Sequence, residues 1–546
     1  PPFVMWLALC VALTASPHRA ECAFVQPLSR LTARASARPR LRSPTEPPRR
    51  VLHVAMQAKV PPQTAPSFLE LLKFTVCAMP IYLSPTLLSL IDTAVVGQVS
   101  SVQLAALGPA CAICDALTGL MVFISVGTTN AVSTTFGGDD KEGAKRAATV
   151  SVVCALAIGC VLALGLSLSI GPAINRVALP AALASAAART GGSAAAAAST
   201  TTLWAACETY VRIRALSFPA ALVLMSAQAS CLGAKDSASP TLATLLASLV
   251  NVAGDAVLVL GPLAMGIAGA AWATVGCQLV AAGMLLRTLA RKGLLDGPTL
   301  RTPPDRAELR RFFSFGGFIF VLLSKQLVYN QGVLLAAVLG TASGAAHQCL
   351  YSLFRLCCTI GDVTGATAQA FLPQYYLTDQ DGKVVGFDAG AARGTIKRIV
   401  AMTGLVALTN TAIAFAVPLL MPGLFTTDFE VMRLMRHAAP WAAAGLLMHP
   451  SVVGMEGCLL ATKDIRWLVS NYVLTGGLSV LATQLLLKLT PLRRVLDLNA
   501  IWIYLATYQG VRFLTFQWRL LLSSSGILRR SLRAQPAAKK ATGKDA

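Results

Sequence analysis

Apolar segments long enough to cross a membrane as helices recur twelve times along this chain. Inside a bilayer every backbone polar group must be satisfied by the protein itself, so only helices and closed barrels can span it. Barrel strands alternate apolar and polar residues, and these segments do not. We therefore predict an all-α polytopic membrane protein with twelve transmembrane helices. The predicted spans are residues 68–97, 104–135, 147–171, 212–233, 240–261, 264–288, 311–338, 342–375, 394–420, 438–461, 466–488 and 499–522.

The composition excludes a soluble chain and a nucleic-acid-binding one. Of the 546 residues, 55% are hydrophobic and only 13% are charged, which leaves too little polar surface for a soluble protein of this length. The formal net charge is +22, but the basic residues are not interleaved with aromatic residues on any polar domain. The expected surroundings are therefore a lipid bilayer, with no nucleic acid as a partner, and we expect a monomer.

The second half of the chain repeats the first. Phe74 matches Phe312 and Gly127 matches Gly365 at one common shift along the sequence. Six spans followed by six spans of the same topology predict two pseudo-symmetric six-helix lobes, related about an axis along the membrane normal. The predicted parts are a presequence at 1–60, an N-lobe at 68–288, an inter-lobe loop at 289–310, a C-lobe at 311–522 and a basic tail at 523–546.

Charge in the connections predicts which side of the membrane each end occupies. Lys and Arg are about twice as frequent in the even-numbered connections as in the odd-numbered ones, so both ends of the folded part lie on this positive side. Two of its turns carry Lys235-Asp236 and Lys463-Asp464, which we interpret as structural salt-bridge turns. Residues 181–203 are of low complexity and could form a weak helix, but we expect an extended loop between the third and fourth spans.

The first 60 residues are typical of a targeting sequence. An apolar run at 3–15 is too short to span a membrane, and residues 28–50 are rich in Arg, Ser and Pro and poor in acids. A signal peptide followed by a transit peptide is similar to the bipartite presequences of secondary plastids, with Phe24 after the cleavage site. This interpretation predicts a plastid envelope protein. The alternative is a basic tail that follows a signal anchor.

Two acidic residues interrupt apolar spans. Asp92 lies in the first span and Asp255 in the fifth, and Asn251 precedes Asp255 by one helical turn on the same face. A charge inside a membrane costs at least a few kcal/mol and marks a functional site by default. Two neighbouring carboxylates in a low dielectric cannot both stay ionised at low cost, so one takes up a proton. Alternatively, Asp255 pairs with a polar neighbour and only stabilises helix packing.

Other polar residues within the spans are candidates for lining a cavity. Asp115 lies in the second span and Asp362 in the eighth, and either could instead pair with a cation such as Arg355. Glu456 lies in the tenth span, and its counterpart in the repeat is near Gln228. These four residues are candidates for lining a cavity, and Glu456 is a candidate for facing the interior of the C-lobe.

The motifs of ATP-driven and metal-dependent proteins are absent from the sequence. There is no G-x-x-x-x-G-K-[ST] phosphate loop, and the five histidines form no box. Cys111 and Cys114 form a C-x-x-C inside an apolar helix without a second pair, so no metal site is predicted. We expect no enzymatic activity and no cofactor, which leaves an ion gradient, of protons or of sodium, as the driving force.

Four stretches together resemble the multidrug and toxic compound extrusion (MATE) transporters, specifically their plant plastid branch. The resemblance extends from about residue 68 to residue 520. The stretches are LSLIDTAVVGQVSSVQLAALGPA around Asp92, ALVLMSAQASCLGAKDSASPTLATLLASLVNVAGDAVLVL at 221–260, ATAQAFLPQYY at 366–376 and MEGCLLATKD at 455–464. The resemblance implies two six-helix lobes that open alternately to each side, and cation-coupled antiport of a small organic substrate.

The resemblance also implies where the ion is bound. In the proton-coupled branches the coupling acid of the first span lies beside an acid and an Asn of the fifth. These positions correspond to Asp92, Asp255 and Asn251, with Thr274 as the nearest match to a Thr of the sixth span. The sodium-coupled branch instead uses a Glu in the seventh span, where this chain has Asn330. The pattern therefore favours a proton site in the N-lobe.

The resulting prediction is a secondary active transporter that exchanges protons for an organic solute. Pro80 and Pro85 permit a bend in the first span, and our hypothesis is that protonating Asp92 bends this helix and collapses the N-lobe cavity. Three alternatives remain open at this point: a sodium-coupled antiporter of the same fold, a lipid-linked flippase, and an intramembrane enzyme with paired aspartates.

Overall fold

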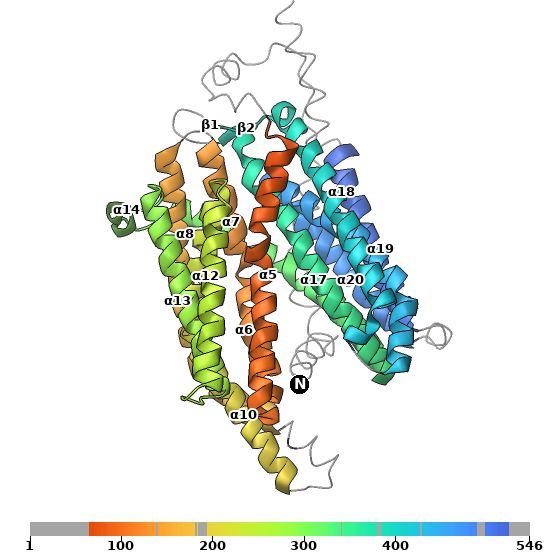
Figure 1. The fold of residues 1–546 in the computed structure, drawn as a ribbon. Coiled ribbons are helices and arrows are strands. Elements are labelled where there is room, and N and C mark those ends of the chain that lie inside the picture. Colours follow the sequence, from red (N-terminus) through yellow and green to blue (C-terminus); the bar gives the residue numbers. More distant parts are fainter. Residues whose placement is uncertain are drawn as a thin grey trace, which may run out of the picture.

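The computed structural model describes residues 65–522, apart from 138–139, 181–182, 184–193, 340, 379–383, 426–427 and 489–496. The predicted presequence and the predicted basic tail therefore lie outside the described residues. Two helical bundles, the N-lobe and the C-lobe, converge at one end and diverge toward the other (Figure 1). The convergent end carries the short β1–β2 hairpin.

The N-lobe consists of long helices, one of them broken into two segments. Its elements are α5 (Phe68–Val99), α6 (Ser101–Leu120), α7 (Val122–Gly137), α8 (Lys141–Ala173), the π-helix η1 (Ile174–Ala178), α10 (Ala194–Ala215), α11 (Phe218–Gly233), α12 (Ala238–Asp255), the π-helix η2 (Ala256–Leu260) and α13 (Ile267–Arg291). Within this lobe α12 packs against both α5 and α13.

Two short helices lead from the N-lobe into the C-lobe. They are α14 (Gly297–Arg301) and α15 (Arg306–Phe313). The C-lobe then contains α16 (Phe318–Val338), α17 (Thr341–Phe371), the 3₁₀ turn η3 (Pro373–Tyr375), strands β1 (Tyr376–Thr378) and β2 (Val384–Phe387), α18 (Ala389–Leu420), the 3₁₀ turn η4 (Pro422–Leu424), α19 (Phe429–Ala461), α20 (Ile465–Lys488), α22 (Leu498–Gln517) and the π-helix η5 (Trp518–Leu522). The two strands pair in antiparallel fashion.

The described helices confirm the polytopic all-α fold. Eight are long and apolar enough to cross a membrane, and the bent pair Ala197–Ala215 with Phe218–Gly233, which is angled by 51°, makes a ninth. The remaining predicted spans coincide with the more polar helices α17, α20 and α22. Each of the twelve predicted segments thus matches one described helix or two consecutive elements, which is consistent with the predicted count.

One prediction about the chain between the third and fourth spans was wrong. Residues 181–203 were expected to form an extended loop, but α10 begins at Ala194, so the second half of this segment is helical. Its run of alanines has the highest intrinsic helix propensity of any residue type, and the helix continues without a break into the fourth span. The span is consequently longer than predicted and bends between α10 and α11.

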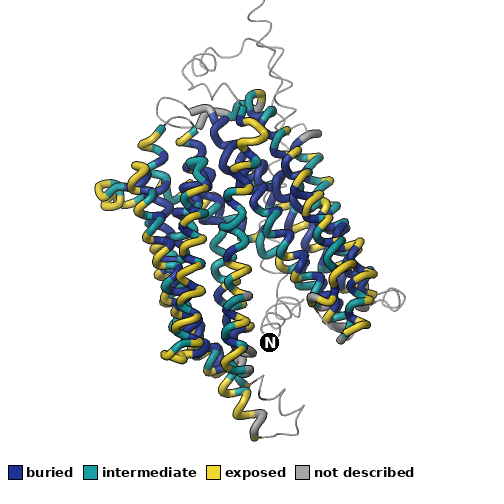
Figure 2. The backbone as a smooth tube through the Cα atoms, in the orientation of Figure 1, coloured by how far each residue is buried: buried dark blue, intermediate teal, exposed yellow. Residues whose placement is uncertain are grey.

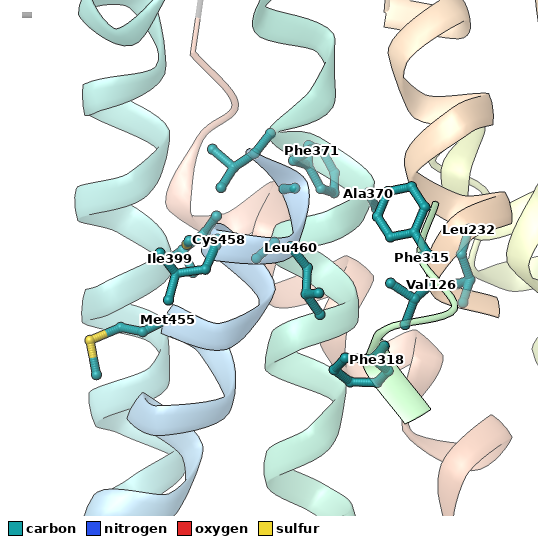
Figure 3. Close-up of a cluster of buried hydrophobic side chains, with 14 of the residues drawn as sticks. Val126, Leu232, Phe315, Phe318, Ala370, Phe371, Ile399, Met455, Cys458 and Leu460 are labelled. Atoms are coloured by element: carbon teal, nitrogen blue, oxygen red, sulfur yellow. The ribbon is translucent and has the colours of Figure 1, made fainter. Parts of the chain in front are cut away.

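The lobes are joined by an apolar core at their convergent end. Buried residues concentrate there (Figure 2). One cluster combines Val126 and Leu232 of the N-lobe with Phe371 and Leu460 of the C-lobe, and with Phe315 from the turn before α16 (Figure 3). The rings of Phe74 on α5 and Phe371 on α17 meet edge to face at 5.2 Å between centroids. Burial of aromatic and aliphatic surface at this junction closes the positive side of the molecule.

Buried polar contacts cross the same junction. The hydroxyls of Thr75 and Thr367 lie 2.7 Å apart, and the Ser133 hydroxyl donates to the Ala370 carbonyl at 2.6 Å. The Lys235 ammonium donates to the side-chain oxygen of Gln374, just before the hairpin. Because buried hydrogen bonds are directional, these contacts fix how the lobes meet rather than only hold them together.

The two Lys-Asp turns contain salt bridges, as predicted, and they occur at equivalent positions of the two lobes. Lys235 and Lys463 end α11 and α19 with φ angles of 61° and 59°. The aspartate that follows each lysine pairs with a cation at the end of its own lobe. Asp236 lies 2.5 Å from the Lys292 ammonium, and Asp464 lies 2.6 Å from Nε of Arg519.

An ion pair links the N-lobe to the inter-lobe segment on the positive side. Nε of Arg146 on α8 donates to Glu308 on α15 at 2.6 Å, and Nη2 donates to its second oxygen at 2.7 Å. The Arg146 hydrogen bonds lower the pKa of Glu308 below its usual value of 4.5. Arg146 also donates to the backbone carbonyls of Thr302 and Pro303, at 3.0 and 2.9 Å.

This ion pair predicts a pH-dependent contribution to stability. A carboxylate with a depressed folded-state pKa stabilises the fold above its unfolded pKa, and this contribution is lost as the pH falls through the folded pKa. We expect Arg146→Gln to lower the thermal unfolding midpoint at neutral pH, by the equivalent of about 1 kcal/mol. The deficit should shrink below about pH 4 but persist in part, because the bonds to the two carbonyls do not titrate. Equal deficits at both pH values would contradict this account. The matched control is Glu308→Gln, which removes the titrating carboxylate and keeps Arg146.

Candidate functional site

The predicted N-lobe residues come from three neighbouring helices and are all buried. Asp92 lies in the last third of α5, nearer the divergent end than the middle of the helix. Asn251 and Asp255 lie on α12, and Thr274 lies on α13. Asp255 is 0% exposed and Asp92 is 6% exposed, although both are acids. The structure therefore brings the four residues to one region of the N-lobe.

Asn251 connects the other residues of this region. With its side-chain nitrogen facing α5, Asn251 donates to Oδ1 of Asp92 at 3.3 Å. Its side-chain oxygen accepts from the backbone N–H of Thr274, also at 3.3 Å. The Thr274 hydroxyl donates to the Ala270 carbonyl of its own helix at 3.0 Å, so Thr274 contributes its main chain to the cluster and not its hydroxyl.

Asp255 is the member of the cluster whose carboxylate lacks a hydrogen-bond donor. Neither of its carboxylate oxygens is solvated, and no donor among the described residues reaches either oxygen. Asp92 lies beside it, close enough for the two carboxyl groups to interact electrostatically. A buried acceptor without a donor costs about 1–3 kcal/mol, and more if it is charged, so binding a proton here relieves an existing cost.

Local backbone geometry lets α12 carry this acid. The α-helix ends at Asp255, and the next five residues form the π-helix η2, a rare geometry that recurs at functional sites. A Cβ at Gly254 would lie 2.8 Å from the Cβ of Ala273, so glycine is needed where α12 meets α13. This close approach allows the Asn251 side chain to reach the main chain of α13.

A basic residue that sequence reasoning missed lies near the acids. Arg214 on α10 is close enough to interact electrostatically with both Asp92 and Asp115, and its Nε is buried without a partner among the described residues. Asp115 itself is exposed on α6. Because residues 181–203 were predicted to form a loop, Arg214 was expected near the beginning of the fourth span. The signal that could have revealed it is the same as for the acids, a charge within an apolar span.

Glu456 is the centre of a second charged cluster, in the C-lobe. The Lys325 ammonium on α16 lies 2.8 Å from Oε1 of Glu456, and Arg512 on α22 lies 3.3 Å from Oε2. The Tyr472 hydroxyl on α20 donates to the same carboxylate. Arg512 is fully buried, and its guanidinium also lies over the Tyr472 ring at 4.8 Å. Glu456 is thus compensated by two cations and a hydroxyl.

A chain of hydrogen bonds extends this cluster toward Asp362. Arg512 donates to Gln509 at 2.8 Å, and Gln509 is 2.9 Å from Nδ1 of His449. Nε2 of His449 lies 3.5 Å from the Asp362 carboxylate, whose side chain is 47% exposed. Arg355 is also within electrostatic range of Asp362, as the sequence allowed. The hydrogen-bonded network of Glu456 therefore ends at His449, and the partly exposed Asp362 lies next to it without completing a hydrogen bond to Nε2.

The other candidates have more local roles. Gln228 donates to the Thr244 hydroxyl at 3.1 Å, within the N-lobe and apart from the acids. Asn330, the repeat counterpart of Asp92, accepts from Gln326 of its own helix at 2.8 Å. Sequence reasoning missed Lys325, Tyr472 and Arg512, because it searched the spans for acids and not for bases. Lys325 and Arg512 carry the same signal as Asp92, a charge within an apolar segment.

Comparisons with known proteins agree with the fold and with the order of the spans. A family model described as MatE matches residues 80–257. Protein DETOXIFICATION 47, chloroplastic, of Arabidopsis thaliana is 31% identical over 463 residues, which cover 84% of this chain and 79% of that protein. Protein DETOXIFICATION 44, chloroplastic, of the same plant is 24% identical, with coverages of 79% and 78%. The crystal structure of a mutant MATE transporter from Vibrio cholerae aligns with a TM-score of 0.68 at 17% identity, covering 86% of this chain and 97% of that one.

The C-lobe cluster predicts an unequal response to two substitutions on α19. Removing one partner of a buried ion pair leaves an uncompensated charge, which costs about 3–5 kcal/mol. We therefore expect Glu456→Gln to lower the thermal unfolding midpoint markedly, because Lys325 and Arg512 lose their carboxylate. Glu430→Gln breaks an exposed ion pair with Arg433 on the same helix and should leave the midpoint unchanged. Similar midpoints for both variants would show that Glu456 is not compensated as described.

Proposed function

We propose that this chain, which belongs to the MATE family of transporters, expels an organic solute in exchange for protons. As a member of that family it is a secondary active efflux transporter and not an enzyme. It is a multi-pass protein of a plastid membrane, since its helices are of spanning length and two of its relatives carry chloroplastic names. We further propose that this membrane is the envelope and that the positive side faces the stroma.

The observation that carries proton coupling is the incomplete hydrogen bonding of the N-lobe cluster. Asn251 holds Asp92 to α13, while Asp255 lies beside Asp92 with no donor of its own among the described residues. A proton supplies the missing donor and removes one of two neighbouring charges. In this proposal Asp92 and Asp255 share the proton, and Asn251 and the main chain of Thr274 position Asp92.

The C-lobe gives a reason to prefer protons over sodium. A sodium site needs oxygen ligands that are available to the ion, and hard cations bind carboxylates that carry uncompensated charge. Glu456 already accepts from Lys325, Arg512 and Tyr472. Because its charge is compensated, this carboxylate is a poor ligand for a further cation. Asp255 of the N-lobe, which lacks a hydrogen-bond donor, is the better candidate for the coupling site.

Helix α5 offers a physical connection between the proton site and the closure of the lobes. Its first turns contact the C-lobe through Phe74 and Thr75, and its last third carries Asp92. Pro80 and Pro85 lie between these two regions, within a helix that is continuous here. Each proline removes one helical hydrogen bond, so bending is least costly at this place.

A contact from α12 bears on the same part of α5. The Thr241 hydroxyl donates to the Cys77 carbonyl, three residues before Pro80. This bond ties α12 to α5 close to the first of the two prolines. Protonation that loosens the Asp92–Asn251 bond would free the last third of α5 from α12, and we propose that the helix then bends at the prolines. The bend would disturb the contacts that close the positive side and so exchange access between the two faces.

Transport in proteoliposomes tests the coupling. We expect efflux of the transported solute, found by screening a panel of organic anions and cations, to follow an imposed pH gradient and not a sodium gradient. Asp92→Asn and Asp255→Asn should each reduce pH-driven flux to the level of protein-free vesicles, because neither amide can bind the proton.

A matched control separates coupling from folding in this experiment. Asp140→Asn makes the same substitution at the N-cap of α8, where Asp140 accepts from the backbone N–H of Gly143 at 2.8 Å. Asparagine caps helices as well as aspartate does, so this variant should transport normally. Parental pH-driven flux in the well-folded Asp92→Asn variant would refute the proposed site, and flux driven only by sodium would refute proton coupling.

A further inference from the structure

A basic cavity opens on the positive side of the C-lobe, away from both charged clusters. Its volume is about 640 Å³, and it lies where the turn between α15 and α16 meets the turn between α19 and α20. Arg310, Lys463 and Arg466 contribute its charge, and Phe313 and Ser314 lie among them. Nothing in the proposed transport cycle uses these residues.

The cations of this cavity lack compensation from the protein. Among the described residues, Arg310, Lys463 and Arg466 form no ion pair. The acid in the lining, Asp464, is already paired with Arg519 at 2.6 Å. Glu308, the one acid within α15, is paired with Arg146. Like charges that share a concave surface favour the binding of an anion.

Lys463 is held in place to present its charge here. The left-handed backbone of Lys463 ends α19, and its ammonium lies over the Tyr376 ring at 4.6 Å. Lys463 is exposed, and the neighbouring Arg311 repels its charge. An anion in the cavity would remove this repulsion.

The position of the cavity favours a lipid head group as the anion. The cavity lies at the positive end of the C-lobe spans, where α16 begins at Phe318 and α20 begins at Ile465. The Phe313 ring in the lining is 50% exposed, which suits contact with acyl chains at the membrane interface. Basic pockets between membrane helices on this side of a bilayer are suited to anionic head groups.

We propose that this cavity binds the phosphate of an anionic lipid head group. Arg310 and Arg466 would contact the phosphate oxygens from the two turns, and Lys463 would contribute charge from between them. The Phe313 ring also lies 6.3 Å from that of Phe123 in the N-lobe, so the bound lipid would lie beside the closed junction of the lobes. The site is independent of the proposed proton coupling.

Native mass spectrometry of the purified protein tests the proposal. In detergent with phosphatidylglycerol, we expect the full chain to retain one lipid more tightly than with phosphatidylcholine. Each cation near a membrane surface contributes roughly 1 kcal/mol to such binding, so Arg310→Gln with Arg466→Gln should weaken that lipid about thirty-fold. Lys463→Gly should weaken it about five-fold while keeping the turn, because glycine adopts a positive φ without strain.

The controls separate the site from general charge and from free anions. Arg393→Gln with Lys397→Gln removes two cations from the start of α18, on the same side of the membrane, and should leave lipid retention unchanged. Inorganic phosphate at equal concentration should not displace the lipid. Equal losses in both double variants, or parental retention in Arg310→Gln with Arg466→Gln, would overturn the proposal. Displacement of the lipid by inorganic phosphate would instead identify a soluble anion as the occupant.

Discussion

The need to satisfy polar groups without water shapes both lobes of this protein. Backbone groups form hydrogen bonds within helices, and the charged side chains within the spans form ion pairs or hydrogen bonds with other side chains. The C-lobe meets it fully at Glu456, where two cations and a hydroxyl surround one carboxylate. The N-lobe meets it only in part, because Asp255 is buried without a donor among the described residues. In the proposed function, this difference between Glu456 and Asp255 makes the N-lobe acids the ones that take up the proton.

The asymmetry is built on a symmetric plan. The repeated turns at Lys235 and Lys463 show how closely the two lobes correspond, down to the left-handed backbone and the paired aspartate that follows each lysine. The polar residues inside the spans do not follow this plan, since Asp92 corresponds to Asn330. The repeat therefore supplies two similar bundles, and the charged residues inside their spans distinguish one bundle from the other.

The sequence predicted the spans, the sides and the acids, but it predicted partners poorly. Asp92, Asn251 and Asp255 were expected to lie together, and the structure places them so. Lys325 and Arg512 were overlooked, although each is a charge within an apolar segment. The prediction of a loop at 181–203 was wrong because the alanines in its second half favour a helix and form the beginning of α10.

The sequence by itself determined which segments are apolar and long enough to enter a membrane and which of them carry charge. These properties depend on local composition, because the transfer of each segment into a bilayer is set largely by its own residues. Only the tertiary structure decided which charges are compensated and which are not. Glu456 and Lys325 are separated by 131 positions, and no local pattern predicts that their side chains meet at 2.8 Å. Packing of whole helices brings distant charges together, and it leaves Asp255 beside Asp92 without a donor of its own among the described residues.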